Sequence, residues 1–264
     1  MNTNRHILHK IAVGLTPEMN IFQVLGHYFL FIGQVFNRPQ KISRFWNQLI
    51  FEINSLGINS LPIIVIISMF MGAALTIQTA YNIESPFIPL YAVGVATRDS
   101  IILEFSPTII SLILAGKVGS NIASEIGTMR ISEQIDALEI MGVNAASFLV
   151  LPKIIAAIII HPFLIVISMF LGVFGGWLFG ILAGVVTTNE FVYGIQYAFH
   201  PFYVGYALIK TVVFAFLITS ISAYFGYYTS GGALEVGSSS TKAVVYSSIF
   251  MLVMNYMLTQ MILS

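Results

Sequence analysis

The sequence offers few residues that could carry out covalent chemistry. It contains no cysteine, which excludes disulfides, thiolate metal sites and cysteine nucleophiles. Gly116-Lys117 does not complete the phosphate-binding pattern GxxxxGK[ST], because Ser111 stands at the first glycine and Val118 follows the lysine. The histidines form neither an HExxH motif nor a His/Asp cluster. They are His6, His9, His27, His161 and His200. We therefore expect no catalytic residue, no metal site and no cofactor in this chain.

Four charged residues instead lie within long apolar stretches: Arg98, Asp99, Glu104 and Lys210. Charged groups at bilayer depth are costly and commonly serve a transport pathway or a partner. Glu104 lies near the middle of its stretch and has two readings of equal weight. Either it forms a buried ion pair, with Lys210 as the candidate partner, that fixes helix packing, or it contacts a transported molecule.

The composition indicates what kind of structure holds these residues in place. The chain has 264 residues, of which 57% are hydrophobic and only 8% charged. A soluble domain carries about 25% charged residues. A mean hydropathy of +0.90 therefore indicates a polytopic membrane protein, and it excludes a soluble enzyme, a nucleic-acid binder and a disordered chain. The eleven basic and eleven acidic residues cancel, so no basic tail suggests a polyanionic partner.

Five apolar stretches reach the roughly 20 residues that a membrane-spanning helix needs. They are residues 61–82, 89–116, 154–186, 203–226 and 242–262. A transmembrane barrel is excluded because the apolar runs are continuous and do not alternate. We therefore predict an all-α polytopic membrane protein with five transmembrane helices in a single transmembrane domain, residues 61–264, preceded by a cytoplasmic N-terminal region, residues 1–60.

Residues 18–37 are apolar but interrupted by polar side chains. We predict an amphipathic helix lying in the cytoplasmic interface of the membrane. Residues at headgroup level would follow it: Arg38, Lys41, Arg44 and Trp46. The alternative is a sixth span, which would upset the distribution of basic residues described next.

The basic residues predict the orientation of the spans. The connections 83–88 and 187–202 contain neither lysine nor arginine. The remaining connections and the N-terminal region hold nine of the eleven basic residues. The nine are Arg5, Lys10, Arg38, Lys41, Arg44, Lys117, Arg130, Lys153 and Lys242. The positive-inside rule then places the N-terminus in the cytoplasm and the C-terminus outside.

Glycines recur every four residues in the third predicted span. They are Gly172, Gly176, Gly180 and Gly184. This spacing gives one stripe of small residues against which another helix can pack closely. We favour packing within one subunit, because such stripes are common in membrane helices.

The long connection 117–153 contains a short amphipathic helix. At 100° per residue, Ile131, Ile135 and Leu138 share an apolar face, and acidic residues occupy the adjoining arc. Ser132 would cap this helix and Gly142 would end it. Its polar side is acidic, which anionic lipid headgroups would repel, so a protein partner is favoured over a membrane surface.

The stretch AGKVGSNIASEIGTMRISEQIDALEIMGVN, residues 115–144, resembles the signature of MlaE/YrbE-type permeases. These are membrane subunits of ABC transporters that work with MCE proteins. The resemblance extends from about residue 50 to the end of the chain. Further matching pieces are Phe70-x-Gly72 with Gln78, Glu104-x-x-Pro107, Ile209-Lys210 and residues 240–248.

The resemblance implies a permease dimer in the bacterial inner membrane, with a cytoplasmic ABC ATPase that binds the ATP and a periplasmic MCE-domain protein. It implies phospholipid as the cargo and a role in the lipid asymmetry of the outer membrane. The segment that docks on the ATPase would be formed by Glu133, Gln134, Asp136, Ala137, Leu138 and Glu139. Residues expected to bind the lipid are Phe70, Leu75, Gln78, Tyr81, Glu104 and Lys210.

Two departures from the family pattern concern the candidate site and the connection. Many relatives carry arginine before the glutamate of the second span, where this chain has Leu103, and Asn144-Ala145 replaces Asp-Pro. The first departure changes how a headgroup or the dimer seam would be held. The alternative function is a secondary transporter of a hydrophobic or amphiphilic molecule. Such transporters often show internal repeats, and none is evident here.

Overall fold

The computed structural model of the chain describes residues 21–37, 42–83 and 88–263, and every regular element in these ranges is helical. This confirms the predicted all-α class. The elements, in chain order, are α2 (Ile21–Val35), α3 (Ile42–Gly57), η1 (Ile58–Ser60), α4 (Leu61–Asn82), α5 (Tyr91–Ser100), η2 (Ile101–Ile110), α6 (Ser111–Leu114), η3 (Ala115–Gly119), α7 (Ser120–Ile131), α8 (Gln134–Ile140), α9 (Ala145–Leu182), α10 (Thr188–Gln196), α11 (Phe202–Tyr227) and α12 (Ala233–Leu263).

Five helical stretches among the described residues are long and apolar enough to cross a membrane. They are Phe45–Asn82, Tyr91–Ile131, Ala145–Leu182, Phe202–Tyr227 and Ala233–Ile262. Each overlaps one predicted span, so the predicted count of five is confirmed. The first stretch begins at Phe45 rather than near residue 61, because α3, η1 and α4 follow one another without a loop.

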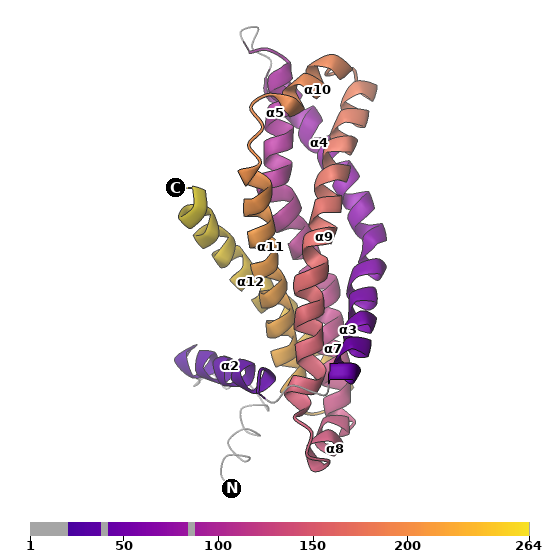
Figure 1. Cartoon of the computed structure of the whole chain (residues 1–264), viewed down its shortest axis with the longest axis vertical. Coiled ribbons are helices and arrows are strands. Elements are labelled where there is room, and N and C mark those ends of the chain that lie inside the picture. Colours follow the sequence, from indigo (N-terminus) through magenta and orange to yellow (C-terminus); the bar gives the residue numbers. More distant parts are fainter. Residues whose placement is uncertain (1–20, 38–41, 84–87, 264) are drawn as a thin grey trace. The chain divides into compact units, whose positions relative to one another are not determined.

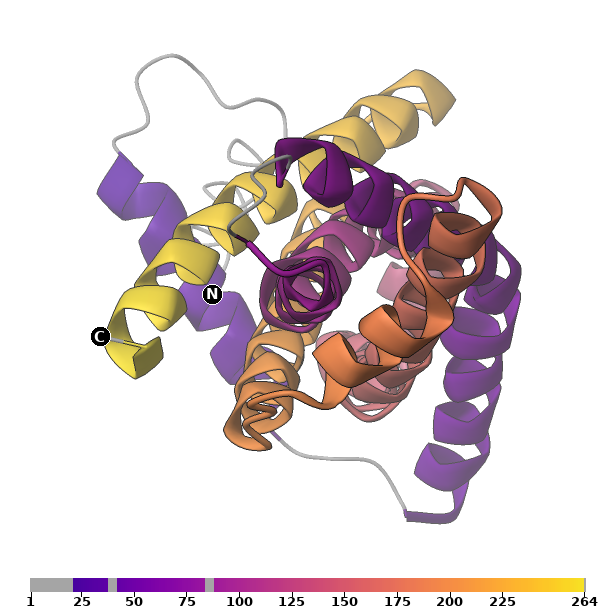
Figure 2. The same ribbon diagram turned by 90° about the horizontal axis from the view of Figure 1, so that it is seen from above.

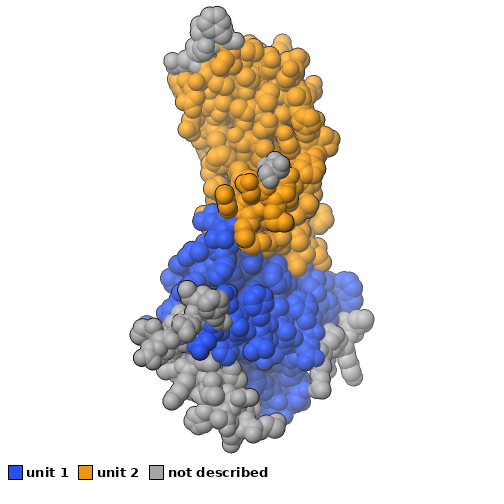
Figure 3. All heavy atoms as spheres, turned by 90° about the vertical axis from the view of Figure 1, so that its left-hand side faces the viewer, with its two compact units in different colours: residues 1–54, 114–157, 215–253 blue, residues 55–113, 158–214, 254–264 orange. Residues whose placement is uncertain are grey.

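The chain divides into two compact units, each assembled from three separate segments (Figure 3). Unit 1 comprises residues 1–54, 114–157 and 215–253. Unit 2 comprises residues 55–113, 158–214 and 254–264. Long helices such as α9 and α11 contribute residues to both units.

In unit 1, α2 lies crosswise to α11 (Figure 1). The hydroxyl groups of Tyr28 and Ser220 hydrogen-bond at 2.6 Å, and the buried ring of Phe31 packs edge-on against Tyr224. Burial raises the pKa of the Tyr28 hydroxyl above its ordinary value, and the Ser220 hydrogen bond opposes this shift. Phe29 lies on the exposed side of the helix. An exposed apolar side is what the predicted interfacial helix needs.

Of the residues predicted at headgroup level, Trp46 is exposed on α3. Arg44 belongs to the same helix, but its side chain is not among those described. Arg38 and Lys41 lie outside the described residues.

A buried ion-pair triad holds three helices of unit 1 together. The Lys153 ammonium on α9 lies 2.6 Å from the Glu52 carboxylate of α3 and 2.8 Å from the Glu125 carboxylate of α7. Lys153 and Glu52 are both buried, whereas Glu125 is partly exposed. Leaving any one of these charges unpaired inside the protein would be costly, so the triad fixes how α3, α7 and α9 pack.

In unit 2, the predicted glycine stripe packs against a helix of the same chain. A Cβ atom placed on Gly72 of α4 would collide with the carbonyl oxygen of Gly172 on α9. One placed on Gly176 would collide with the Thr76 hydroxyl oxygen. The two backbones therefore approach closely, as small residues permit in membrane helices. This confirms packing within one subunit, although Gly184 lies beyond the end of α9, in a turn with φ +70°.

At one end of unit 2, the short helix α10 packs against α5 (Figure 1 and Figure 2). A Cβ atom on Gly94 would meet the Phe191 carbonyl oxygen at 2.7 Å, so glycine is required at this crossing. The helix starts with a capping box formed by Thr187 and Glu190.

Replacing Gly72 with alanine should destabilise the protein by about 1–3 kcal/mol, the usual cost of overpacking a tight contact. The added methyl group would collide with the Gly172 carbonyl oxygen. Thermal unfolding of the detergent-purified protein measures the effect. Gly205→Ala is the matched control, because Gly205 is also helical but faces open space. Equal losses of stability in the two variants would contradict the close crossing.

Candidate functional site

The second span is interrupted by a π-helix around Pro107. The segment η2 runs from Ile101 to Ile110, and π-helical turns are frequent at functional sites. The Lys210 ammonium of α11 donates to the Leu103 carbonyl of this segment, at 3.2 Å. A charged side chain of one helix thus binds the backbone of the irregular segment in another.

Lys210 also forms an ion pair with Glu104, 2.8 Å from its Oε1 atom. The Lys210 side chain is 0% exposed, whereas Glu104 is 42% exposed. The ammonium also lies 4.8 Å from the centre of the Tyr206 ring. The buried ion pair, one of the two readings of Glu104, is therefore present. Its partial exposure leaves the second reading open as well.

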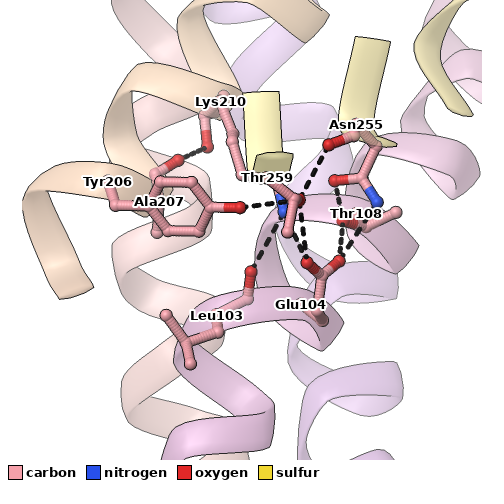
Figure 4. A network of polar contacts seen from close by, with 9 residues as sticks. Leu103, Glu104, Thr108, Tyr206, Ala207, Lys210, Asn255 and Thr259 are labelled. Atoms are coloured by element: carbon pink, nitrogen blue, oxygen red, sulfur yellow. Dashed lines mark hydrogen bonds and ion pairs between the residues drawn. The ribbon is translucent and has the colours of Figure 1, made fainter. Parts of the chain in front are cut away.

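Helix α12 supplies further polar groups to this network (Figure 4). The Asn255 amide nitrogen donates to Glu104 Oε2 at 3.2 Å, and the Thr108 hydroxyl donates to the same oxygen at 3.0 Å. The Thr259 hydroxyl lies 2.8 Å from the Tyr206 hydroxyl and 3.4 Å from Glu104 Oε1. The network thus joins η2, α11 and α12 around one carboxylate.

Asn255 and Thr259 were not among the residues singled out from the sequence. A signal was available, because an asparagine and a threonine four residues apart share one face of an otherwise apolar span. Polar side chains on one face of a membrane helix usually find a partner within the bundle.

The four α4 residues predicted to bind the lipid lie apart from this network. Phe70 and Tyr81 are highly exposed, Gln78 is exposed and Leu75 is half-buried. The Phe70 ring stacks on Phe179 of α9. Within the described part of the chain, none of the four forms a hydrogen bond with Glu104 or Lys210. The structure thus brings two of the six predicted lipid-binding residues together and leaves the other four on the surface of α4.

Arg98 and Asp99 have a different role from Glu104. Arg98 is buried and pairs with Asp99 at 2.8 Å. It also donates to the carbonyl oxygens of Ile195 and Tyr197, at 2.7 and 2.8 Å. These carbonyls lie at the end of α10, where a helix carries partial negative charge. Arg98 therefore anchors α10 on α5.

A second candidate site lies in unit 1, at the predicted amphipathic helix. The structure confirms a helix there, α8, with Ile135 buried and Leu138 half-buried. Gly142 ends it as predicted, with φ +78°. The N–H of Gly142 donates to the Glu139 carbonyl, and that of Val143 donates to the Leu138 carbonyl. These two hydrogen bonds form a Schellman motif.

The predicted start of this helix is wrong by one residue. Ser132 ends α7 and its hydroxyl donates back to the Thr128 carbonyl, so it does not cap α8. Glu133 stands at the cap position instead, with a left-handed backbone at φ 60°. The reversal of chain direction between α7 and α8 requires this conformation, and a helical periodicity does not reveal it.

The acidic residues at α8 differ in their interaction partners. Asp136 pairs with Arg130 of α7 at 2.8 Å, and Glu139 accepts a hydrogen bond from the Tyr227 hydroxyl of α11 at 2.9 Å. Glu133 is exposed, as are Gln134 and Ala137. Burial raises the pKa of the neighbouring Tyr228, and the charge of Arg130 opposes this shift. Two of the three carboxylates thus fasten α8 to unit 1.

Two large apolar side chains at the end of α8 face outward. Ile140 is 87% exposed and Met141 is 67% exposed. A pair of large, highly exposed apolar side chains is typical of a protein interface and uncommon on a surface that stays in water.

Comparison with known proteins shows which chains this one is similar to. The family described as Permease MlaE matches residues 49–261. A probable ABC transporter permease protein of Rickettsia prowazekii is 36% identical over 256 residues, 97% of this chain and 96% of that protein. The intermembrane phospholipid transport system permease protein MlaE of Haemophilus influenzae is 29% identical over 243 residues, covering 91% and 92%. The chloroplastic protein TRIGALACTOSYLDIACYLGLYCEROL 1 of Arabidopsis thaliana is 31% identical over 227 residues, covering 86% and 65%.

Replacing Lys210 with methionine should destabilise the protein by about 3 kcal/mol, the lower end of the cost of breaking a buried ion pair. The change removes the partner of Glu104 and the donor to the Leu103 carbonyl. Adding Glu104→Gln to this variant should restore part of the stability, because the double variant carries no unpaired charge. Thermal unfolding of both variants checks this, and a further loss in the double variant would show that the pair is not what stabilises the site.

Proposed function

The chain belongs to the MlaE permease family, and we propose that it is the membrane subunit of an ABC transporter that moves phospholipid. In this proposal a separate ATPase subunit hydrolyses the ATP, and this chain carries out no covalent chemistry and binds no cofactor. The observation that carries the proposal is the set of exposed residues on α8, with Glu133 at its start and Ile140 and Met141 at its end.

Helix α8 is suited to transmit a mechanical force. It is short and packs on its own unit through the buried Ile135. The Asp136–Arg130 pair ties it to α7, and the Glu139–Tyr227 hydrogen bond ties it to α11. A partner that grips the exposed side of α8 would therefore move α7 and α11 with it. Since α11 also carries Lys210, this movement reaches the helix that holds the Glu104 network.

The cargo is proposed from the membrane-embedded surface of unit 2. The exposed side of α4 carries Phe70 and Tyr81, which suit contact with acyl chains, and Gln78, which suits a polar group. Glu104 and Lys210 supply the charged pair of the same unit. The relative from Haemophilus influenzae, named as an intermembrane phospholipid transport permease, supports phospholipid over other amphiphiles.

We also propose the location, orientation and partners of the chain. It places the protein in the bacterial inner membrane with a cytoplasmic N-terminus and a periplasmic C-terminus, because most basic residues would then lie inside. The proposed partners are an ABC ATPase on the cytoplasmic side, an MCE-domain protein on the periplasmic side and a second copy of this chain. Helix α8 then faces the cytoplasm and α10 faces the periplasm.

Replacing Glu133 with lysine should weaken the association with the ATPase at least about tenfold, because a reversed charge at an interface disfavours the original partner. Glu133 suits the test because, within the described residues, it forms no ion pair that the change would break. Co-purification of the ATPase measures association, and ATP-dependent lipid transfer in reconstituted vesicles measures coupling.

The matched control is Glu235→Lys, which changes the net charge equally at an exposed position of α12. The double variant Asp136→Lys/Arg130→Glu tests the acidic side of α8 further. The ion pair can still form, but its two charges are exchanged between α8 and α7. Full ATPase binding and lipid transfer in Glu133→Lys would refute the assignment of α8. Transfer that needs no ATPase would indicate a secondary transporter.

The orientation can be tested because the chain has no native cysteine. A single cysteine introduced at Ser132 should react with an impermeant thiol reagent only after the inner membrane is opened. One introduced at Asn189, on the exposed start of α10, should react in intact spheroplasts. Labelling of the Ser132 position in intact spheroplasts would reverse the proposed topology.

A further inference from the structure

The network around Glu104 does not fill every acceptor site of its carboxylate, because two of the nearby hydroxyl groups share their protons with other acceptors. The Thr108 hydroxyl has one proton, yet two acceptors lie within reach, Glu104 Oε2 at 3.0 Å and Asn255 Oδ1 at 3.2 Å. The Asn255 amide is already turned so that its nitrogen donates to the carboxylate. Turning it around would place two acceptors against each other. When the Thr108 proton goes to Asn255 Oδ1, Glu104 Oε2 keeps only the Asn255 N–H, and one of its lone pairs is free.

The same shortage recurs one turn further along α12. The single proton of the Thr259 hydroxyl is shared between its own helix, at the Asn255 carbonyl 2.8 Å away, and Glu104 Oε1 at 3.4 Å. The shorter of the two contacts is the stronger, so Oε1 depends mainly on Lys210. Glu104 thus keeps acceptor capacity on both of its oxygens.

The basic side chains of unit 2 are not accessible to a ligand. The unit contains two basic residues, Lys210 and Arg98, and both are buried. The Lys210 ammonium donates to the Leu103 carbonyl and to Glu104, and it lies 4.8 Å from the centre of the Tyr206 ring. Arg98 is held by Asp99 and by two carbonyl groups. No adjacent side chain adds a cation, because the residue before Glu104 is Leu103.

The accessible charge at the network is therefore that of a carboxylate. Glu104 is 42% exposed, whereas its counter-charge is fully buried. A molecule that approaches from the exposed side meets an anionic acceptor with unused capacity and finds no free cation. A primary ammonium carries both a positive charge and N–H donors, and it satisfies such a site with charge-assisted hydrogen bonds. A headgroup with net negative charge gains nothing there and is repelled.

We propose that the Glu104 network selects the lipid headgroup, favouring a primary ammonium such as that of ethanolamine and disfavouring headgroups with net negative charge. This selectivity rests on the proposed function, since it presupposes a phospholipid cargo. Glu104 accepts the N–H donors directly. Asn255 and Thr108 act as positioning residues, because both donate to the carboxylate and the single Thr108 proton is shared between Glu104 and Asn255.

The test uses the purified full-length chain equilibrated with mixed micelles. These contain equal amounts of phosphatidylethanolamine, phosphatidylcholine and phosphatidylglycerol with identical acyl chains, and native mass spectrometry measures the bound lipid. The wild-type chain should retain ethanolamine lipid over glycerol lipid by about tenfold, the value of one charge-assisted hydrogen bond. Choline lipid should fall between them, because its quaternary ammonium is charged but has no N–H.

Two variants separate headgroup selection from a structural role. Glu104→Gln removes the charge and supplies an N–H donor of its own, so the preference should disappear while phospholipid is still bound. Asn255→Leu keeps the carboxylate but removes the competing acceptor, and it should reduce the preference without reversing it. Tyr256→Phe is the matched control on α12, because Tyr256 is 71% exposed and lies outside the network. It should keep the wild-type preference.

The possible results distinguish failure of the headgroup inference from failure of the proposed function. Equal retention of the three lipids by the wild-type chain would overturn the headgroup inference while leaving phospholipid transport standing. An unchanged preference in Glu104→Gln would also overturn it. Equal retention of choline and ethanolamine lipid would show that charge alone acts, against the role assigned to N–H donation. Retention of no phospholipid at all would overturn the proposed function together with the inference.

Discussion

The pairing of Lys210 with Glu104 is the interaction on which the membrane-embedded site depends. An unpaired ammonium inside an apolar helical bundle would cost several kcal/mol, so Lys210 has to find acceptors. It finds two within η2, the Glu104 carboxylate and the neighbouring Leu103 carbonyl oxygen. The buried charge therefore fixes the position of Glu104 relative to α11.

The same rule governs the other buried cations that the structure describes. Lys153 lies between two carboxylates, and Arg98 lies between a carboxylate and the last carbonyl groups of α10. In each case a basic side chain joins helices that are distant in the sequence. What distinguishes Lys210 is that its carboxylate partner belongs to an acceptor-rich cluster and is half exposed. The Lys153 triad has one exposed carboxylate too, but no cluster of amide and hydroxyl groups forms around it in the described residues.

The two candidate sites differ in what they expose. Helix α8 offers an outward-facing side with Glu133, Ile140 and Met141, while its other carboxylates fasten it inward. The Glu104 network offers a partly exposed carboxylate held by two other helices. Helix α11 carries one residue of each site, Tyr227 and Lys210.

Apolar length and helical periodicity are local properties, so they were enough to predict the class of the protein, the number of spans and the existence of α8. Glu104 and Lys210 could also be identified in this way, since charges in apolar stretches are visible without a structure. The packing of the helices was needed to show which of these charges pair, that Asn255 and Thr259 complete the network, and that Glu133 rather than Ser132 stands at the cap of α8. These outcomes depend on which helices lie side by side and on one left-handed backbone angle, and neither is encoded in the spacing of residues along a single helix.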